Sequence, residues 1–290
     1  MITYSLVIPH KNTPKLLQRC LESIPQREDV EVIVVDDNSD EHLKPYVNRH
    51  DVILLEIGSD WSKGAGRARN IGLSQAKGRW VLFADADDYY EKGFIDVLDQ
   101  YKDCDADVVY FDHQMVRDGK IIKNRYPFVD RYDVTNSATL DVVKYRFNVP
   151  WNKMVKKTFL TSKKITFEET PVGNDVFFSY QVGFLARKVF VDKAIIYNYV
   201  INNNSTIRSK KNNDAFYLAQ LCHHYQCNRF YEYVGCPSWC RSIIRLFTAI
   251  IVKKGLGQFL LAIRVFSHHY SDIIKGKEFF VNEIKSRCYD

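Results

Sequence analysis

The stretch Trp80-Val81-Leu82-Phe83-Ala84-Asp85-Ala86-Asp87-Asp88 places a wholly apolar run directly before a cluster of acids. Trp80–Ala84 is too short for a helix and consists of apolar side chains, which predicts a buried strand that ends where the acids begin. Two further apolar runs lie upstream. Tyr4–Ile8 reads as a strand ended by Pro9, and Val30–Val35 is followed by Asp36-Asp37-Asn38-Ser39. Continuous apolar strands of this kind are typical of a parallel sheet covered on both faces.

Helical patterns separate these strands. Lys15–Ile24 repeats apolar residues at helical spacing, and Gly64–Ala76 reads as a loop that enters a helix, with Gly78 as its C-terminal cap. Further strands are expected at Val52–Glu56 and Val108–Phe111, and a further helix at Phe94–Tyr101. This alternation predicts an α/β fold with a mostly parallel, Rossmann-like sheet flanked by helices. Ligands of such sheets bind at the carboxyl ends of the strands, where both acid clusters lie.

Composition excludes several classes of protein. The 290 residues are 46% hydrophobic and 26% charged, so the chain is neither disordered nor fibrous. The seven cysteines lack the paired Cys-x-x-Cys spacing of zinc sites, and we expect reduced thiols in a cytoplasmic protein. No secretory signal precedes the first strand, and no apolar run reaches the length of about 20 residues that a membrane-spanning helix needs.

The acids after the strand Trp80–Ala84 have two interpretations. Asp85 and Asp87 project from a strand end and could share a divalent cation, since Mg²⁺ and Mn²⁺ prefer oxygen ligands that substrate phosphates often complete. The alternative is an acidic turn that solvates the strand end. Asp36 and Asp37 could bind a base or ribose, or could form an Asx turn with Asn38 and Ser39.

Basic residues lie between the two acid clusters. Lys63, Arg67 and Arg69 surround two glycines that would allow the backbone to approach a phosphate closely. Arg69 occupies the third glycine position of the dinucleotide fingerprint, and the chain contains no P-loop. Rossmann dehydrogenases and P-loop kinases are therefore poor interpretations.

The order of these pieces resembles the inverting nucleotide-sugar transferases of glycosyltransferase family 2. The resemblance covers residues 3–208 and rests on the segments Ser5–Pro9, Val34–Ser39, Ala68–Leu73, Gly78, Phe83–Asp88, Pro150–Lys157, Ile165–Glu169, Asn174–Phe178 and Tyr197–Tyr199 with Ser205. It implies a GT-A fold, a nucleotide-sugar donor, for which we expect UDP, and Mn²⁺ or Mg²⁺ as cofactor. It also implies the residues of the donor site, which are Pro9, His10, Asn12, Asp36, Asp37, Lys63, Arg69, Asp85 and Ala86.

The resemblance also implies roles in catalysis. Asp87 would hold the metal, with Asp88 as the alternative ligand. Asp175 matches the base that takes the proton of the acceptor hydroxyl, or it caps the helix expected over Val176–Ala186. Trp151 resembles an aromatic on the acceptor side, or it is a core tryptophan. A Gln-x-x-Arg-Trp motif, typical of processive synthases, is absent, so we expect transfer of one sugar at a time.

The region 209–290 lies outside the resemblance and is expected to be a basic, helical C-terminal domain. The chain from Ser205 onward carries 13 Lys and Arg against 6 Asp and Glu. Apolar residues recur at helical spacing in two stripes, Trp239, Ile243, Leu246, Phe247, Ile250 and Ile251, and then Leu256, Phe259, Leu260, Ile263 and Phe266. Such stripes pack on the catalytic domain, on a second subunit of a homodimer, or on anionic lipid at the inner face of the membrane.

Together these features predict a metal-dependent, inverting glycosyltransferase. It would move one sugar from a nucleotide-diphosphate sugar to a hydroxyl of a glycan or lipid-linked acceptor, in surface polysaccharide biosynthesis. Two alternatives remain open at this point. A sugar-phosphate nucleotidyltransferase should carry a Gly-rich basic loop where this chain has His10-Lys11-Asn12-Thr13-Pro14, and a non-catalytic binding protein should have lost Asp87 or Asp175. A nucleic-acid binder is disfavoured because the basic residues are dispersed among apolar helix faces.

Overall fold

The computed structural model describes residues 1–40, 43, 46–47, 49–58, 64–170, 173–201 and 213–273. The chain forms two compact units. One comprises Met1–Glu169 and Asn174–Asn202, and the other comprises Thr170–Gly173 and Asn203–Asp290. The expected domain boundary between residues 208 and 209 lies outside the described residues.

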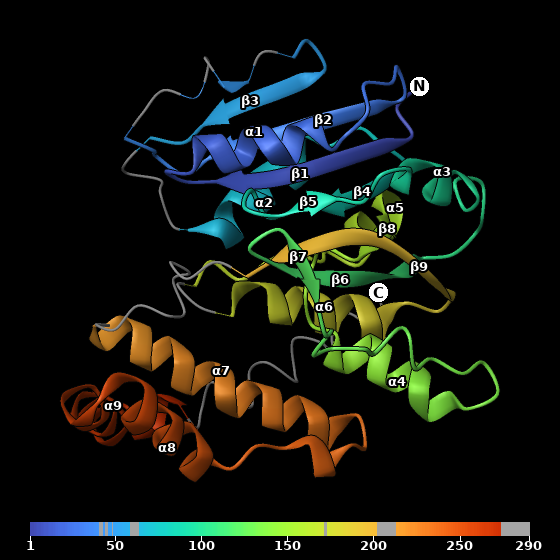
Figure 1. Cartoon of the computed structure of the whole chain (residues 1–290). Helices are drawn as coiled ribbons and strands as arrows, with labels where there is room; N and C mark the ends of the chain where they lie inside the picture. The colour runs from blue at the N-terminus through green and yellow to red at the C-terminus, as the bar shows by residue number, and fades with distance from the viewer. Residues whose placement is uncertain are drawn as a thin grey trace. The chain divides into compact units, whose positions relative to one another are not determined.

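The first unit contains a nine-stranded sheet in the order β3-β2-β1-β4-β8-β6-β9-β5, with β7 paired to β6 (Figure 1). The strands β1 (Tyr4–His10), β2 (Val30–Asp36), β3 (Val52–Glu56) and β4 (Trp80–Phe83) are parallel. They are the four strands expected from the apolar runs. The mostly parallel α/β sheet that the sequence predicts is therefore confirmed.

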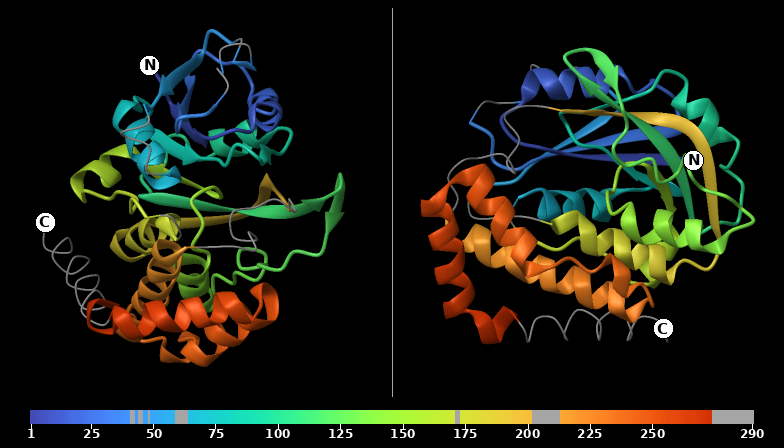
Figure 2. Two further views of the ribbon diagram at one scale, coloured as in Figure 1. Left: turned by 90° about the vertical axis from the view of Figure 1, so that its left-hand side faces the viewer. Right: turned by 60° about the horizontal axis from the view of Figure 1, so that its bottom comes forward.

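The helices α1 (Pro14–Glu22) and α2 (Ala65–Gln75) connect these strands. The chain moves outward from β1 through α1 to β2 and β3, then returns through α2 to β4 on the other side of β1. Because parallel crossovers are right-handed, this reversal places the two helices on opposite faces of the sheet, as Figure 2 shows. The carboxyl ends of β1 and β4 border the point where strand order reverses, which is where open α/β sheets bind ligands.

Two local expectations about this part of the sheet were wrong. Pro9 does not end β1, because it pairs in register with Val35 and the strand continues to His10. Proline is tolerated there because β4 pairs with β1 only as far as Val7, which leaves no partner for an N–H on that side. Gly78 does not cap α2. A Cβ at Gly78 would lie 2.6 Å from the Ser5 nitrogen, so its small size permits close packing on β1.

The second half of the sheet is formed by segments of mixed direction. Its strands are β5 (Tyr89–Tyr90), β6 (Val108–Arg117), β7 (Lys120–Ile122), β8 (Lys153–Lys156) and β9 (Val189–Val200). The strand β8 lies antiparallel between β4 and β6, and β9 runs parallel to β6. The helices here are α3 (Phe94–Asp99), α4 (Ser137–Arg146), α5 (Lys157–Ser162) and α6 (Asn174–Leu185).

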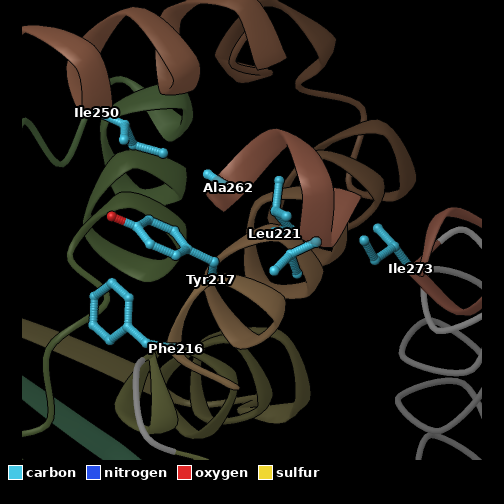
Figure 3. Packing of buried hydrophobic residues seen from close by; sticks show 7 residues of the cluster. Phe216, Tyr217, Leu221, Ile250, Ala262 and Ile273 are labelled. Carbon is cyan, nitrogen blue, oxygen red and sulfur yellow. The ribbon is translucent and has the colours of Figure 1, made fainter. Parts of the chain in front are cut away.

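The second unit is helical in its described part, as expected. It contains α7 (Asp214–Tyr233), the short 3₁₀ helix η4 (Pro237–Trp239), α8 (Ile243–Lys254) and α9 (Leu256–His268). Its core brings Phe216, Tyr217 and Leu221 of α7 together with Ile250 of α8 and Ala262 of α9 (Figure 3). Among the described residues, no helix is both long and apolar enough to cross a membrane.

Candidate active site

The carboxyl edge of the parallel strands gathers most of the residues singled out from the sequence. Pro9 and His10 end β1, Asp36 ends β2, and Asp85 is the second residue after β4. Asp37 donates its backbone N–H to the His10 carbonyl at 2.8 Å. The first two predicted clusters therefore share one edge of the sheet, as their positions at strand ends require.

His10 and Asp36 form a buried polar pair at the end of β1 and β2. His10 Nδ1 lies 2.8 Å from Asp36 Oδ1, and His10 Nε2 accepts the Thr13 N–H at 3.0 Å. Because Nε2 accepts, Nδ1 carries the proton and donates to the carboxylate. Ser39 completes the pair, since its N–H donates to Asp36 Oδ2 at 3.0 Å. The Asp36 carboxylate is thus held in place by His10 and Ser39.

Asn12 connects the loop after β1 to the loop after β2. Its backbone N–H donates to Ser39 Oγ at 2.8 Å, and its side-chain amide exchanges hydrogen bonds of 3.1 and 2.9 Å with Asp40. A hollow of about 680 Å³ opens beside this bridge, lined by Asn12, Thr13, Pro14, Lys15, Leu16, Ser39, Asp40, Leu43 and Tyr46. Its size and mixed lining suit a small polar ligand.

Asp37 is buried and faces the start of α2. Its Oδ2 accepts the Gly64 N–H at 3.1 Å, and Lys11 Nζ lies 3.8 Å from the same oxygen. Lys63, which directly precedes Gly64 in the sequence, lies outside the described residues. The structure gives a different reason for a glycine at position 66 than the sequence suggested. A Cβ at Gly66 would lie 2.0 Å from the Glu168 carbonyl oxygen. The glycine permits protein packing rather than a close approach to phosphate.

Arg69 connects the acid cluster after β4 with the helix α6. Its Nη2 donates to Asp85 Oδ1 at 2.6 Å, and its Nη1 donates to Asn174 Oδ1 at 2.8 Å. Arg69 is 5% exposed, and its guanidinium lies over the Phe167 ring, 5.4 Å from the ring centroid. Asn174 precedes Asp175 in the first turn of α6. One buried cation therefore joins the acid cluster after β4 to the first turn of α6, which carries Asp175.

The three acids after β4 occupy different environments. Asp85 and Asp87 are half-buried, whereas Asp88 is buried and its Oδ1 accepts the Val200 N–H at 2.7 Å. Burial, together with the neighbouring Asp85 and Asp87 carboxylates, raises the pKa of Asp88 well above its usual range. The Asp85 N–H donates to Tyr197 Oη at 2.9 Å, and Ala86 is buried between the acids.

The residues present fit part of a divalent-cation site. Among the described residues, no three His, Cys, Asp or Glu side chains come together as a ligand set. Asp88 Oδ2 is buried and has no hydrogen-bond partner in the described part of the chain, and Asp87 offers a more accessible carboxylate close by. Hard oxygen ligands suit Mg²⁺ or Mn²⁺, which commonly complete their coordination with substrate phosphates and water.

Lys153 is a residue that the sequence analysis missed. It begins β8, is fully buried, and donates to the Val149 carbonyl at 2.6 Å while its amine lies 5.0 Å from the Tyr110 ring centroid. Burial lowers the pKa of Lys153 to about 7, and the Asp175 carboxylate opposes this shift. The available signal in the sequence was that Lys153 lies among the apolar residues Trp151, Met154 and Val155.

Trp151 lies among core aromatics. Its ring stacks on Tyr197 at 4.8 Å and on Tyr199 at 5.6 Å, with interplanar angles of 10° and 11°. His113 packs against it at 5.0 Å, and the side chain is buried. This favours the second interpretation that the sequence left open, a core tryptophan, which here supports the tyrosine whose hydroxyl binds Asp85.

Comparison with known proteins agrees with this geometry. The model of the family "Glycosyl transferase family 2" matches residues 5–169, more than half of the chain. The chain belongs to glycosyltransferase family 2. This confirms the resemblance drawn from the sequence, and it disfavours the nucleotidyltransferase alternative.

Relatives of this family 2 chain include bacterial proteins that are named as glycosyltransferases. It is 26% identical to EpsH of Bacillus subtilis, and the match covers 62% of that protein. It is also 26% identical to a poly(ribitol-phosphate) beta-glucosyltransferase of Bacillus spizizenii, of which the match covers 32%. The chain thus spans less than two thirds of the length of these two relatives. It is 25% identical over 75% of its length to a GalNAc(5)-diNAcBac-PP-undecaprenol beta-1,3-glucosyltransferase of Campylobacter jejuni, and the match covers 71% of that protein.

Solved structures of similar fold are also glycosyltransferases. The S. aureus TarS 1-349 complex with UDP-GlcNAc superimposes with a TM-score of 0.62 at 19% identity, covering 99% of this chain and 91% of that one. A mannosyltransferase of Pyrobaculum calidifontis in complex with GDP-Man and Mn²⁺ gives 0.54 at 12% identity over 99% of this chain and 86% of that one. At these identities the likeness concerns the fold, which is that of the GT-A glycosyltransferases the sequence predicted.

Proposed function

We propose that this chain is an inverting glycosyltransferase that moves one sugar from a nucleotide-diphosphate sugar to a hydroxyl of a glycan or lipid-linked acceptor in bacterial surface polysaccharide synthesis. The observation that carries the proposal is the contact of Arg69 with both Asp85 and Asn174. It joins the donor-side acids to the first turn of α6, where Asp175 lies. Donor and base would thus meet at one sheet edge.

Donor binding is assigned to the carboxyl ends of β1, β2 and β4. Asp37, held by the Gly64 N–H, would accept hydrogen bonds from the base, and Asp85 would accept one from the ribose. The hollow beside Asn12 and Asp40 lies next to the same loops. The UDP-GlcNAc bound by the similarly folded TarS supports UDP as the nucleotide.

Asp87 would hold a divalent cation at the donor diphosphate, and Asp88, being buried and hydrogen-bonded to Val200, is the less suitable of the two ligands. The cation would stabilise negative charge on the leaving diphosphate. The Mn²⁺ in the mannosyltransferase of similar fold supports this choice.

Asp175 would take the proton from the acceptor hydroxyl as that oxygen attacks the anomeric carbon. It lies in the first turn of α6, where the helix N-terminus favours negative charge. Attack from the face opposite the departing diphosphate gives inversion. The C. jejuni relative, whose name specifies an undecaprenol-linked acceptor, supports a lipid-linked acceptor here.

Thermal unfolding of the full chain with UDP or GDP, with and without Mn²⁺, tests the donor site. A ligand at about 100 times its dissociation constant stabilises the folded state by about 2.7 kcal/mol. We expect this with UDP and Mn²⁺ together, and loss of it in Asp87→Ala but not in the exposed control Asp103→Ala. Stabilisation without metal would contradict the cation site. No stabilisation by any nucleoside diphosphate would contradict the transferase and favour a non-catalytic binding protein.

A further inference from the structure

The helices α8 and α9 each carry two apolar faces. On α8, Ile243, Leu246, Phe247 and Ile250 belong to or pack on the core shared with α7, and on α9, Phe259, Ala262, Val265 and Phe266 do the same. Most of the first stripe identified in the sequence is therefore internal packing of this unit. Figure 3 shows Ile250 and Ala262 directed toward the α7 side chains.

The opposite faces of the same helices are apolar and exposed. On α8, Ile244 and Val252 are 72% and 78% exposed, and on α9, Leu256 and Leu260 are 59% and 55% exposed. Residues four or seven to eight apart share one face of a helix, so Ile251 and Ile263 extend these two stripes. Since both helices direct their other face into one core, the two stripes lie on the outer surface of this unit. We call these six residues the outer apolar face.

The segment that carries the outer apolar face contains charge of one sign only. From Arg241 to Tyr270 the sequence contains no Asp or Glu. Arg241, Arg245 and Lys253 are exposed beside the α8 stripe. Two other cations have partners within the unit, because Arg264 pairs with Asp214 at 2.7 Å and Lys254 Nζ lies 4.8 Å from the Phe216 ring centroid.

We propose that the outer apolar face rests on a bilayer of anionic lipid, with the aliphatic side chains at the boundary between headgroups and acyl chains. Apolar residues of this size are removed from water there, and Arg241, Arg245 and Lys253 meet anionic headgroups. A second copy of the chain is the less suitable partner, because two such faces would bring the cations Arg241, Arg245 and Lys253 of both copies together.

Only the biological purpose of this membrane contact rests on the proposed function, because the enzyme would reach a lipid-linked acceptor at the bilayer surface. Its physical basis is independent of the site. Binding to lipid does not require a donor, a metal or Asp175. Failure to bind vesicles and failure to bind UDP would therefore be separate results.

Flotation of the full chain with vesicles tests the proposal. We expect it to float with vesicles of phosphatidylcholine containing 30% phosphatidylglycerol, weakly with phosphatidylcholine alone, and less as salt is raised, because surface charge is screened over about 10 Å at 0.1 M. Replacing both Arg245 and Lys253 by Gln should weaken binding to anionic vesicles by roughly tenfold or more.

The apolar contribution is tested by the variant Val252→Ser, Leu256→Ser, Leu260→Ser. It should lose vesicle binding while keeping its unfolding temperature, since these side chains face solvent. The matched control is Ile121→Ser, Val134→Ser, which removes side chains that are 68% and 82% exposed in the other unit. No flotation of the native chain, equal loss in the control, or a dimer that only the triple variant dissociates would overturn the proposal.

Discussion

Arg69 Nη2 lies 2.6 Å from Asp85 Oδ1, and the same guanidinium reaches Asn174 at 2.8 Å. These residues come from α2, the end of β4 and the start of α6. The buried Arg69 therefore fixes the distance between the acids assigned to the donor and the helix turn that carries Asp175. A planar fork with several donors suits such a bridge, and a lysine could not make both contacts in the same way.

Replacing Arg69 by Met should separate these elements. The half-buried acceptors Asp85 and Asn174 lose a charged donor, which costs about 2 kcal/mol of unfolding free energy. The matched control is Arg67→Met, since Arg67 pairs with Glu169 at 2.9 Å in a more exposed position and should cost less than about 1 kcal/mol. Chemical denaturation measures both values. Equal losses would show that Arg69 has no special role in joining the site.

Gly66→Ala should displace the segment that leads to α6. The new Cβ would meet the Glu168 carbonyl oxygen at 2.0 Å and the Asn174 Cβ at 3.0 Å, so the backbone must move. We expect a loss of about 1–3 kcal/mol, the usual cost of overpacking. In the control Gly257→Ala the new Cβ meets nothing within 4 Å, and helix propensity should raise stability by up to about 1 kcal/mol. An unchanged melting temperature in Gly66→Ala would contradict the packing described.

Lys153 should make stability depend on pH. Its pKa is about 7 in the folded chain and near 10.5 when unfolded, so between these values the unfolded chain binds more protons and stability rises with pH. The slope from this group is at most about 1.4 kcal/mol per pH unit. Lys153→Met should remove this pH dependence. The measurement is the difference in unfolding free energy between pH 7 and pH 10. If the unfolding free energy of the native chain and of Lys153→Met depends on pH in the same way, Lys153 is protonated in the folded chain, which would contradict this account.

Much of the fold could be predicted because the deciding signals are local. The apolar runs at β1, β2 and β4 are buried on both faces, and acids at their ends mark the carboxyl edge. The strand β8 was not placed, because its four residues Lys153–Lys156 show no apolar run and its antiparallel position depends on distant partners. The helix α4 has a weak apolar pattern, with only Val143 and Tyr145 buried, and was missed for that reason.

The sequence predicts the residues of a candidate site, but not the contacts between them. His10 and Asp36 end adjacent strands, so their proximity follows from the sheet. The contact of Arg69 with Asp85 depends on how α2 packs, and the burial of Lys153 contradicts the usual preference of lysine for solvent. The outer apolar face was also ambiguous, because a helix with two apolar faces does not reveal from sequence which one is internal.

The most direct measurement is sugar-nucleotide turnover by the purified chain and by Asp175→Asn. We expect the native chain, with Mn²⁺ and a UDP-sugar, to release UDP in the presence of an acceptor. Asp175→Asn should keep UDP binding but lose at least about 100-fold in turnover, because a positioned general base contributes roughly 10²–10⁴. Turnover at the native rate in Asp175→Asn, with the control Asp103→Asn unchanged, would contradict the assignment of Asp175 as the base.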